Sequence, residues 1–228
     1  MPACDIKLGV DSKIKPENRI IKRRLPGDVR REAIVTEATR MFADSGFEVS
    51  TRDIAGRCDI TQAALYKHFS SKNDIVQAVF RNCFLDRDIS YFADALADTG
   101  QSLEARITSA YQMFFQHMER VRQRLFLRAA MEGYPLPKDY SSTLDHGMLD
   151  PLAEQLRIDA GLPPLDKEQM RHAERELVLL LHSAIVFLAL RRNIYNIDLD
   201  AEAPWIIAQD VSVWLTGARQ RMQEIWTM

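Results

Sequence analysis

The sequence predicts an all-α protein of about nine helices, in which a small N-terminal three-helix unit precedes a larger helical body. No proline occurs between Gly27 and Tyr134, and this stretch is rich in residues that favour helices. Runs of alternating β-branched residues, which would indicate strands, do not occur in the sequence. Of the 228 residues, 46% are hydrophobic and 27% are charged, which excludes a disordered or collagen-like chain.

Charge, cysteine content and hydropathy exclude further classes of protein. The formal net charge of −2 implies no partner by itself. Cys4, Cys58 and Cys83 are too few for a disulfide framework and do not have metal-ligand spacing, so we expect a reduced, cytoplasmic protein. No apolar run follows the basic N-terminal residues, so no secretory signal is expected. The longest apolar run, residues 177–190, is shorter than the ~20 residues of a membrane span and predicts a buried core or interface helix.

Residues 1–25 are expected to form a basic, poorly ordered arm. Between residues 13 and 31 the chain carries eight basic residues and two acidic ones. Two interpretations stay open, a solvated tail or an arm that contacts nucleic-acid phosphates or a minor groove.

The first helix is expected at residues 28–45. Asp28 is its expected N-cap, and Gly46 is the expected residue of left-handed conformation after its C-terminus. Apolar residues recur at i, i+4, i+7 and i+8, which places them on one helical face. These residues are Ile34, Ala38, Met41 and Phe42.

Two short helices and a tight turn follow. Ser50 and Asp53 form the expected capping box of the second helix. A turn is expected at residues 58–60, and Thr61 can cap a third helix at residues 62–68.

The remaining sequence predicts longer helices, separated by glycine, proline and asparagine breaks. Gly147 and Pro151 are expected to kink the helix that contains them. The expected helices span residues 71–92, 102–120, 122–132, 140–160, 166–193 and 202–223.

The order of helix, short helix, tight turn and short helix predicts a helix-turn-helix at residues 26–74. Such a unit binds DNA by fitting one helix into the major groove while its partner braces it, so the helix contacts need small or apolar side chains such as Ala55, Ile60 and Leu65. Charge supports this division, because residues 1–72 carry 14 basic and 10 acidic residues, a net charge of +4, whereas the rest carries −6.

Within residues 31–80 the sequence resembles the tetracycline-repressor (TetR) family of transcriptional regulators. Three motifs carry the resemblance: A-x-x-x-F-x-x-x-G-F in the first helix, T-x-x-I-A in the second, and L-Y-x-x-F-x-x-K in and after the third. The match covers about 50 of the 228 residues, and its typed positions recur at fixed offsets in one continuous window.

The resemblance implies a role in DNA binding for eight residues. Thr51 would contact a phosphate through its hydroxyl or amide, and Arg52 would reach a base or a phosphate. Thr61 and Gln62 would meet base edges, and Gln62 can bind adenine in a bidentate manner. The remaining residues are Tyr66, which would place its hydroxyl on a phosphate, Lys67 and His68, which would face DNA, and Lys72, which would anchor a phosphate.

The turn departs from the family pattern, which has Ala-Gly where this chain has Cys58 and Asp59. Glycine is favoured there because the turn needs a positive φ, and aspartate tolerates that conformation better than most residues. Cys58 allows two interpretations, a redox switch or a small buried residue in an alanine position.

Residues 75–228 would form a helical ligand-binding and dimerisation domain. The resemblance implies a ligand pocket inside it and a homodimer built from the last two long helices. The run at residues 176–190 is apolar on nearly all faces, so one face can meet the subunit core and another needs a partner chain, unless the helix is wholly buried within one subunit.

Aromatic and methionine residues of the central helices allow two interpretations, an adaptable pocket lining or plain core. The candidate ligand-binding residues are Tyr111, Phe114, Phe115, Met118, Phe126 and Met131. His117, His146, His172 and His182 lack metal-ligand spacing, so neither a metal nor a cofactor is expected.

The sequence and the resemblance together imply a ligand-responsive transcriptional regulator, most often a repressor. It would bind a palindromic double-stranded DNA operator as a homodimer and be released by a small molecule. Two alternatives stay open. An all-helical enzyme would need catalytic motifs that the sequence does not offer, and a helical ligand-binding or interaction protein would have lost DNA binding through its altered turn.

Overall fold

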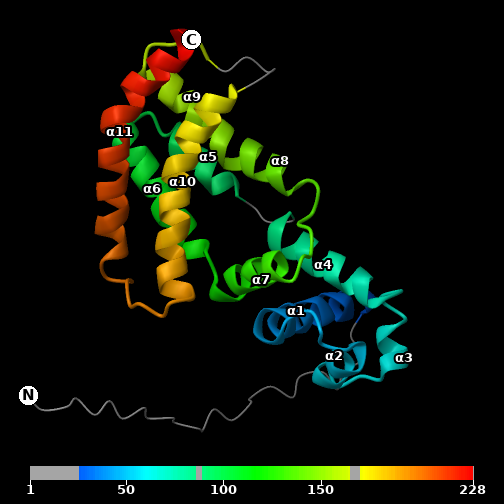
Figure 1. Ribbon diagram of the computed structural model, residues 1–228. Helices are drawn as coiled ribbons and strands as arrows, with labels where there is room; N and C mark the ends of the chain where they lie inside the picture. The colour runs from blue at the N-terminus through cyan, green and yellow to red at the C-terminus, as the bar shows by residue number, and fades with distance from the viewer. Residues whose placement is uncertain (1–25, 86–88, 165–169, 228) are drawn as a thin grey trace, which may run out of the picture.

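The computed structural model describes residues 26–85, 89–164 and 170–227, and within these ranges it contains eleven α-helices and one π-helical segment. Every regular element in this part of the chain is helical, so the all-α prediction is confirmed. Helices α1 to α3 gather at one end of the molecule, whereas α9 and the C-terminus lie at the other (Figure 1). The expected basic arm, residues 1–25, lies outside the described residues.

The N-terminal unit is built by α1 (Gly27–Ser45), α2 (Thr51–Arg57), α3 (Gln62–Leu65) and α4 (Lys72–Phe84). Their apolar faces form one core, which includes Phe42, Leu65 and Phe80. Helix α7 (Arg120–Met131) adds Leu125 and Ala129 to the same core. The N-terminal unit is therefore packed against a helix that lies far away in the sequence.

Local capping explains where the first helices begin. Ser50 and Asp53 form the predicted capping box of α2, and hydrogen bonds from the side chain and then the backbone of Ser50 lower the pKa of Asp53. The N-cap prediction for Asp28 was wrong: α1 begins one residue earlier, with Pro26 as N-cap, and Asp28 lies in the first turn. An acidic side chain there still stabilises the helix through the helix dipole.

The helix predicted at residues 71–92 was too long, because its two halves belong to different cores. Helix α4 ends at Phe84, and the separate α5 (Ser90–Ala97) follows. Phe80 is buried in the N-terminal core, whereas Phe92 and Leu96 are buried in the core of the body. This additional helix is one reason why the predicted number of helices was too small.

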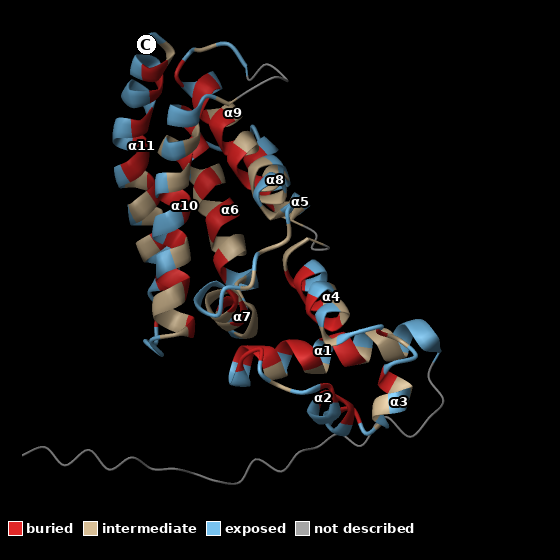
Figure 2. Cartoon of the chain, turned by 45° about the vertical axis from the view of Figure 1, so that its right-hand side comes forward, coloured by how far each residue is buried: buried red, intermediate tan, exposed pale blue. Residues whose placement is uncertain are grey.

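The body contains the remaining helices, with the buried sides of α6, α9 and α10 directed inward (Figure 2). Its core includes Ile107, Leu152 and Ile185. No helix in the described ranges has the length and apolar character to cross a membrane. The helices not yet given are α6 (Leu103–His117), α8 (Tyr140–Leu144), the π segment η1 (Asp145–Leu149), α9 (Asp150–Asp159), α10 (His172–Asn193) and α11 (Ala203–Thr227).

The helix predicted at residues 140–160 is interrupted where Gly147 and Pro151 were expected to kink it. A π turn occupies Asp145–Leu149, and the N–H of Asp150 bonds to the carbonyl of Asp145. Pro151 has no N–H, and its ring would clash with the carbonyl four residues earlier, so the wider turn accommodates it. A Cβ atom on Gly147 would lie 2.0 Å from Cδ1 of Ile89, which shows how closely the segment after α4 approaches this turn.

Candidate nucleic-acid interface and the cavity beside it

The turn between α2 and α3 fixes the direction of α3. The N–H of Ile60 donates to the carbonyl of Ala55 at 3.0 Å, and the N–H of Asp59 donates to the carbonyl of Gly56 at 3.2 Å. This pattern is a Schellman motif, which needs a left-handed residue directly after the helix. Asp59 has a φ of 54°, which confirms the predicted positive φ at this position.

Helix α3 buries one side and exposes the other. Leu65 is fully buried beneath it, whereas Tyr66 is 47% exposed and Lys67 is also exposed. The helix ends at Leu65, three residues before the predicted end at His68. The backbone then tightens, because the N–H of His68 donates to the carbonyl three residues earlier, that of Leu65, at 2.9 Å.

Three of the predicted DNA-binding residues form one hydrogen-bonded group. Nε2 of Gln62 donates to Oγ1 of Thr51 at 2.8 Å, and this hydroxyl lies 3.2 Å from the hydroxyl of Tyr66. Thr51 is buried as the first residue of α2, so its hydroxyl connects α2 to α3. The sequence did not indicate these contacts, because each joins residues of different helices.

The other predicted residues surround this group. Thr61 caps α3, since its side chain accepts a hydrogen bond from the N–H of Ala64 at 3.1 Å. Arg52 is exposed on the first turn of α2, and half-buried Lys72 begins α4. Neither Arg52 nor Lys72 has an ion-pair partner among the residues that the structure describes.

Arg31 braces α3 from α1, a role that sequence reasoning missed. Its Nη1 donates to the carbonyl of His68 at 2.6 Å, and its guanidinium carbon lies 4.1 Å from the ring centroid of Phe69. The sequence showed Arg31 only as one of a run of basic residues. Its contacts reveal a structural role behind the exposed face of α3.

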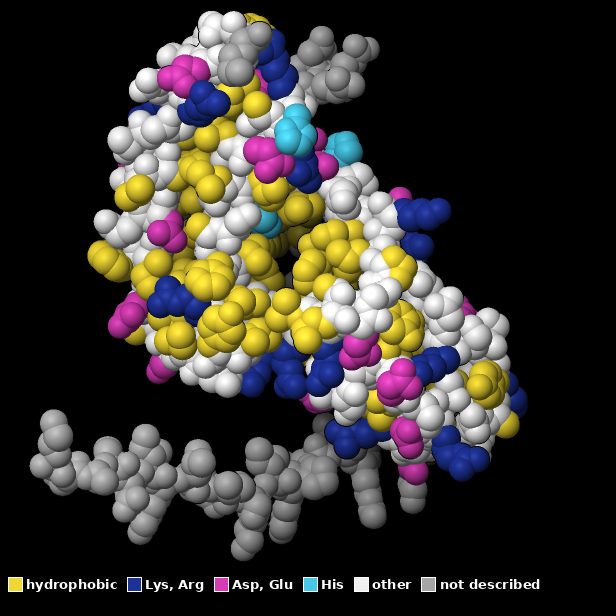
Figure 3. Space-filling view, in the orientation of Figure 1, with side chains coloured by type: hydrophobic (Ala, Val, Ile, Leu, Met, Phe, Trp, Pro, Cys, Tyr) yellow, Lys and Arg dark blue, Asp and Glu magenta, His cyan; other side chains and the backbone are white. Residues whose placement is uncertain are grey.

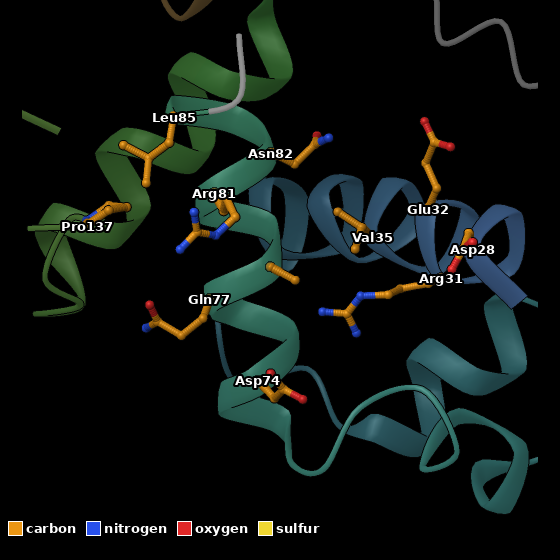
Figure 4. Close-up of a pocket in the computed structure, with 11 residues that line it drawn as sticks. Asp28, Arg31, Glu32, Val35, Asp74, Gln77, Arg81, Asn82, Leu85 and Pro137 are labelled. Atoms are coloured by element: carbon orange, nitrogen blue, oxygen red, sulfur yellow. The ribbon is translucent and has the colours of Figure 1, made fainter. Parts of the chain in front are cut away.

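Arg31 also lines an open, polar hollow of about 490 Å³ between α1 and α4 (Figure 4). Carboxylates of Asp28, Glu32 and Asp74 share this lining with Arg31 and Arg81. The charges of the lining therefore oppose one another, and the hollow indicates no single class of ligand.

Cys58 is buried in the N-terminal core. Burial raises the pKa of its thiol to about 11, and the carboxylate of Glu37 adds to this effect. The thiol is therefore protonated at neutral pH, which is its unreactive form. This environment favours the interpretation of a small buried residue over that of a redox switch.

A second cavity, of about 180 Å³, lies where the body meets the end of α4. Figure 3 shows hydrophobic side chains around a hollow in the middle of this face. Six α-helices and the π segment η1 contribute to the lining, together with Ile89 just before α5 and Met118 just after α6. The lining residues are Cys83, Phe84, Ile89, Tyr91, Phe114, His117, Met118, Arg122, Gln123, Phe126, Tyr140, Thr143, Leu144, Met148, His182 and Val186.

The structure places three of the six candidate ligand-binding residues at this cavity, namely Phe114, Met118 and Phe126. Tyr111 and Phe115 are buried in the core of the body instead. Met131 is 86% exposed and lies away from the cavity. It follows Phe126 by five residues, which turns it to a different side of α7.

Sequence reasoning missed most of the cavity wall, because it comes from residues far apart in the chain. Phe84, Phe126 and Tyr140 form an aromatic triangle whose ring centroids are 5.8 to 5.9 Å apart. Arg122 and His182 add polar groups to the lining. Only the aromatic character of the segment around Phe126 gave a signal in the sequence.

Within the part of the chain that the structure describes, three polar atoms at or beside the cavity are buried and have no hydrogen-bond partner: Oη of Tyr111, Nδ1 of His182 and Nη1 of Arg122. Burial lowers the pKa of His182 to about 4, so this imidazole is neutral at physiological pH. Burial also raises the pKa of Tyr111. Unsatisfied buried polar groups are rare in proteins and are expected where a ligand or water binds.

The outer sides of α10 and α11 form an exposed apolar face, which we call the α10–α11 face. Leu180 is 65% exposed, Trp205 is 67% exposed and Val213 is 75% exposed. Phe187 also belongs to this face and is 54% exposed. Within the described ranges, no group of three or more His, Cys, Asp or Glu residues is placed to bind a metal.

Comparisons with known proteins agree with this geometry. Residues 34–79 match the family model described as "Bacterial regulatory proteins, tetR family". The transcriptional activator FasR of Mycolicibacterium smegmatis is 34% identical over 44% of this chain and 45% of its own length. The transcriptional repressor KstR2 of the same organism is 36% identical over 40% and 43%. The chain thus aligns with about half the length of these relatives.

Solved structures share the fold over most of the chain. A TetR-like regulator from Rhodococcus sp. RHA1 has a TM-score of 0.60 at 23% identity, covering 85% of this chain and 100% of that one. A regulator from Pseudomonas aeruginosa PAO1 has a TM-score of 0.62 at 14% identity, covering 86% and 93%. The matching model describes regulatory proteins, and both relatives are named as transcriptional regulators. The N-terminal helices of this chain therefore resemble the DNA-binding segment of the TetR family, and the fold of the described residues is similar to that of TetR-like regulators.

Proposed function

We propose that this protein is a ligand-responsive transcriptional repressor that binds a palindromic operator as a homodimer. The observation that carries the proposal is the exposed polar surface of α3 and of the turn directly after it, with Tyr66 and Lys67 outward and Leu65 buried beneath. The Schellman turn and Arg31 fix this short helix in one orientation. A rigid, polar and narrow element of this kind fits the major groove.

Phosphate contacts would set the position of the protein on the duplex. Lys72 and the hydroxyl of Tyr66 supply donors at the edges of the interface. The hydroxyl of Thr51 accepts from Gln62 and lies 3.2 Å from the hydroxyl of Tyr66, so the backbone amide of Thr51, in the first turn of α2, would supply the phosphate contact. These contacts would act on any DNA sequence and would weaken as salt rises.

Base reading would fall to Gln62 and its neighbours. One Nε2 hydrogen of Gln62 is donated to Thr51, which leaves the second hydrogen and Oε1 for the N7 and N6 positions of adenine. The contact with Thr51 also fixes the amide before DNA arrives, which lowers the entropic cost of binding. Arg52, Thr61, Lys67 and His68 would complete the contacts.

The α10–α11 face supports the homodimer. Leu180, Phe187, Trp205 and Val213 expose large apolar side chains on two neighbouring helices. Exposed apolar surfaces of this kind mark protein–protein contacts. A two-fold dimer would bring two copies of α3 to successive major grooves of a palindrome.

The cavity of about 180 Å³ supports control by a small molecule. Its lining includes Cys83 and Phe84 at the end of α4, and α4 belongs to the core of the N-terminal unit. A ligand that fits one arrangement of α4 better than another would shift the population between them. We propose repression as the outcome, as in the relative named as a repressor, although FasR is named as an activator.

Selection of DNA fragments by the purified full-length chain tests this function. We expect enrichment of one palindrome, and we expect Gln62→Ala to lose discrimination between that palindrome and random DNA. Gln220→Ala is the matched control, because Gln220 is an exposed glutamine on α11. Failure to enrich any sequence would favour the alternative of a helical interaction protein without DNA binding.

A further inference from the structure

Arg122 is an unusual member of the cavity lining. Among the described residues that line the cavity, it is the only Asp, Glu, Lys or Arg. Its Nη2 donates to Oε1 of Glu119 at 3.3 Å, whereas its Nη1 is buried and has no hydrogen-bond partner among the described residues. The side chain is 20% exposed, so water screens only part of its charge. Arg122 therefore places a positive charge with a free donor against an apolar wall.

An arginine donor in this position selects for an acceptor that carries negative charge. Guanidinium groups form their strongest hydrogen bonds with carboxylates and phosphates, and they do not lose their proton in proteins. A ligand without an acceptor would leave Nη1 of Arg122 unsatisfied in the apolar cavity. Glu119 compensates only one side of the guanidinium, because it pairs with Nη2.

The walls near Arg122 define the rest of the ligand. Phe126 follows Arg122 by four residues on α7, so the two side chains are neighbours on one helix face. Phe126 belongs to the aromatic triangle with Phe84 and Tyr140. An apolar ring or short chain can pack on these aromatic rings while its charged end reaches Nη1.

Volume limits the size of this ligand. The cavity of about 180 Å³ is slightly larger than a cavity of ~150 Å³ that accommodates benzene. A single ring or a short alkyl chain with one carboxylate fills such a space. We infer that the effector is a small amphipathic monocarboxylate, with its carboxylate on Arg122 and its apolar part against Phe84, Phe126 and Tyr140.

This inference rests on the proposed function of the cavity as an effector site, and calorimetric titration without DNA tests it separately. The probes are phenylacetate, benzoate and hexanoate, each compared with its neutral amide. We expect at least one carboxylate to bind about tenfold or more tightly than its amide. Arg122→Met should abolish this preference, and Arg122→Lys should retain part of it.

Two further variants separate the anion site from general effects of charge. Arg120→Met is the matched control, because Arg120 is an exposed arginine on the same helix and does not line this cavity. It should leave the preference unchanged. Glu119→Gln should strengthen carboxylate binding, because it removes the competing negative charge beside Nη2.

Equal binding of carboxylates and amides, or binding of neither series, would overturn the inference. If Arg122 had only a structural role, Arg122→Met would lower the folded fraction. Glu119→Gln would then leave the affinity for carboxylates unchanged. DNA binding is measured on the same preparations. Carboxylate binding without any DNA binding would contradict the proposed regulator and leave the anion site intact.

Discussion

Glu132 on α7 accepts a hydrogen bond at 2.8 Å from the backbone N–H of Phe47, a residue 85 positions earlier in the chain. A Cβ atom added to Gly46 would lie only 2.5 Å from Oε1 of the same carboxylate, and Gly46 has a φ of 81°. Any side chain at Gly46 would therefore displace Glu132 and strain the backbone. This contact joins the end of α1 to the body of the protein.

Arg124 and Arg128 complete the same junction. Arg128 donates to the carbonyls of Ala43 and Asp44 at 3.2 and 3.0 Å, and Arg124 pairs with the carboxylate of Asp44 at 2.9 Å. The carbonyls at the C-terminus of α1 carry partial negative charge, so these cations stabilise the helix end. Since α7 also lines the cavity, one helix contacts both the cavity and α1.

Replacement of Glu132 by alanine is expected to destabilise the protein by about 1–3 kcal/mol, because it leaves the Phe47 amide without its acceptor and removes the ion pair with Arg128. Urea unfolding measures this change in the free energy of unfolding. Glu48→Ala is the control, since Glu48 is exposed beside Phe47, and it should change stability by less than about 0.5 kcal/mol. Equal effects of the two variants would show that the junction contributes no stability.

Lys72→Ala is expected to weaken binding to all DNA sequences about equally and to reduce the salt slope by about one ion. The reason is that a phosphate contact carries no sequence information. Binding isotherms at several salt concentrations, on the selected palindrome and on random DNA, check this expectation. Arg221→Ala, on the last turns of α11, should change neither quantity. An unchanged slope for Lys72→Ala would remove Lys72 from the interface.

Asp59→Gly is expected to stabilise the protein by roughly 0.5–1 kcal/mol. Relief of the left-handed backbone strain contributes about 1–2 kcal/mol, and the greater freedom of glycine in the unfolded chain opposes it by about 0.5–1 kcal/mol. Asp59→Asn removes the charge but keeps the side chain, so it should strengthen DNA binding with little change in stability. If Asp59→Asn stabilised the protein as much as Asp59→Gly, charge rather than backbone strain would explain the effect.

The α10–α11 face is expected to form the dimer. Leu180→Glu and Val213→Glu should shift the chain toward monomers, because each buries a charge in an apolar contact. Sedimentation or light scattering over a range of concentrations measures the shift. Ile158→Glu, at an exposed apolar residue of α9, is the control and should leave the dimer intact. Dimers that persist in both charged variants would place the interface elsewhere.

His182 should make stability depend on pH. Its pKa falls from 6.5 to about 4 on folding, because burial disfavours the charged imidazole. The unfolded chain therefore binds a proton that the folded chain does not, and this group costs stability as pH falls from 6.5 to about 4. The loss should approach roughly 3 kcal/mol. Urea unfolding at several pH values measures this loss. The free energy of unfolding of His182→Asn should fall by roughly 3 kcal/mol less over this pH range. His172→Asn, at an exposed position, should show the same pH dependence as the parent protein.

The N-terminal helices could be predicted from the sequence because their signals are local. The capping box of Ser50 and Asp53 lies within four residues, and the positive φ of Asp59 follows from turn chemistry. The predicted end of α4 failed for the opposite reason. Residues 71–92 contain no glycine or proline to indicate a break, but Phe80 and Phe92 are buried in two different cores, and the sequence does not distinguish those cores.

The cavity could be predicted only in part. Phe114, Met118 and Phe126 were candidates because aromatic and methionine residues cluster on the central helices. Their partners come from α4, α8 and α10, and no spacing in the sequence brings those helices together. Met131 shared the composition signal but lies on another side of α7. Tertiary packing therefore decides which apolar residues line a cavity and which lie in the core or on the surface.

The proposed homodimer places two copies of α3 in the major groove. The most direct test of this arrangement is to measure the affinity of the protein for the selected palindrome while the separation of its half-sites is varied. Two copies of α3 related by a two-fold axis require half-sites on the same face of the duplex, about one helical turn or a multiple of it apart. We expect one separation to bind best, and we expect insertion of about 5 bp to reduce affinity by at least about tenfold, because it turns one half-site to the opposite face. Equal affinity at every separation, or equal affinity for a single half-site, would contradict the account.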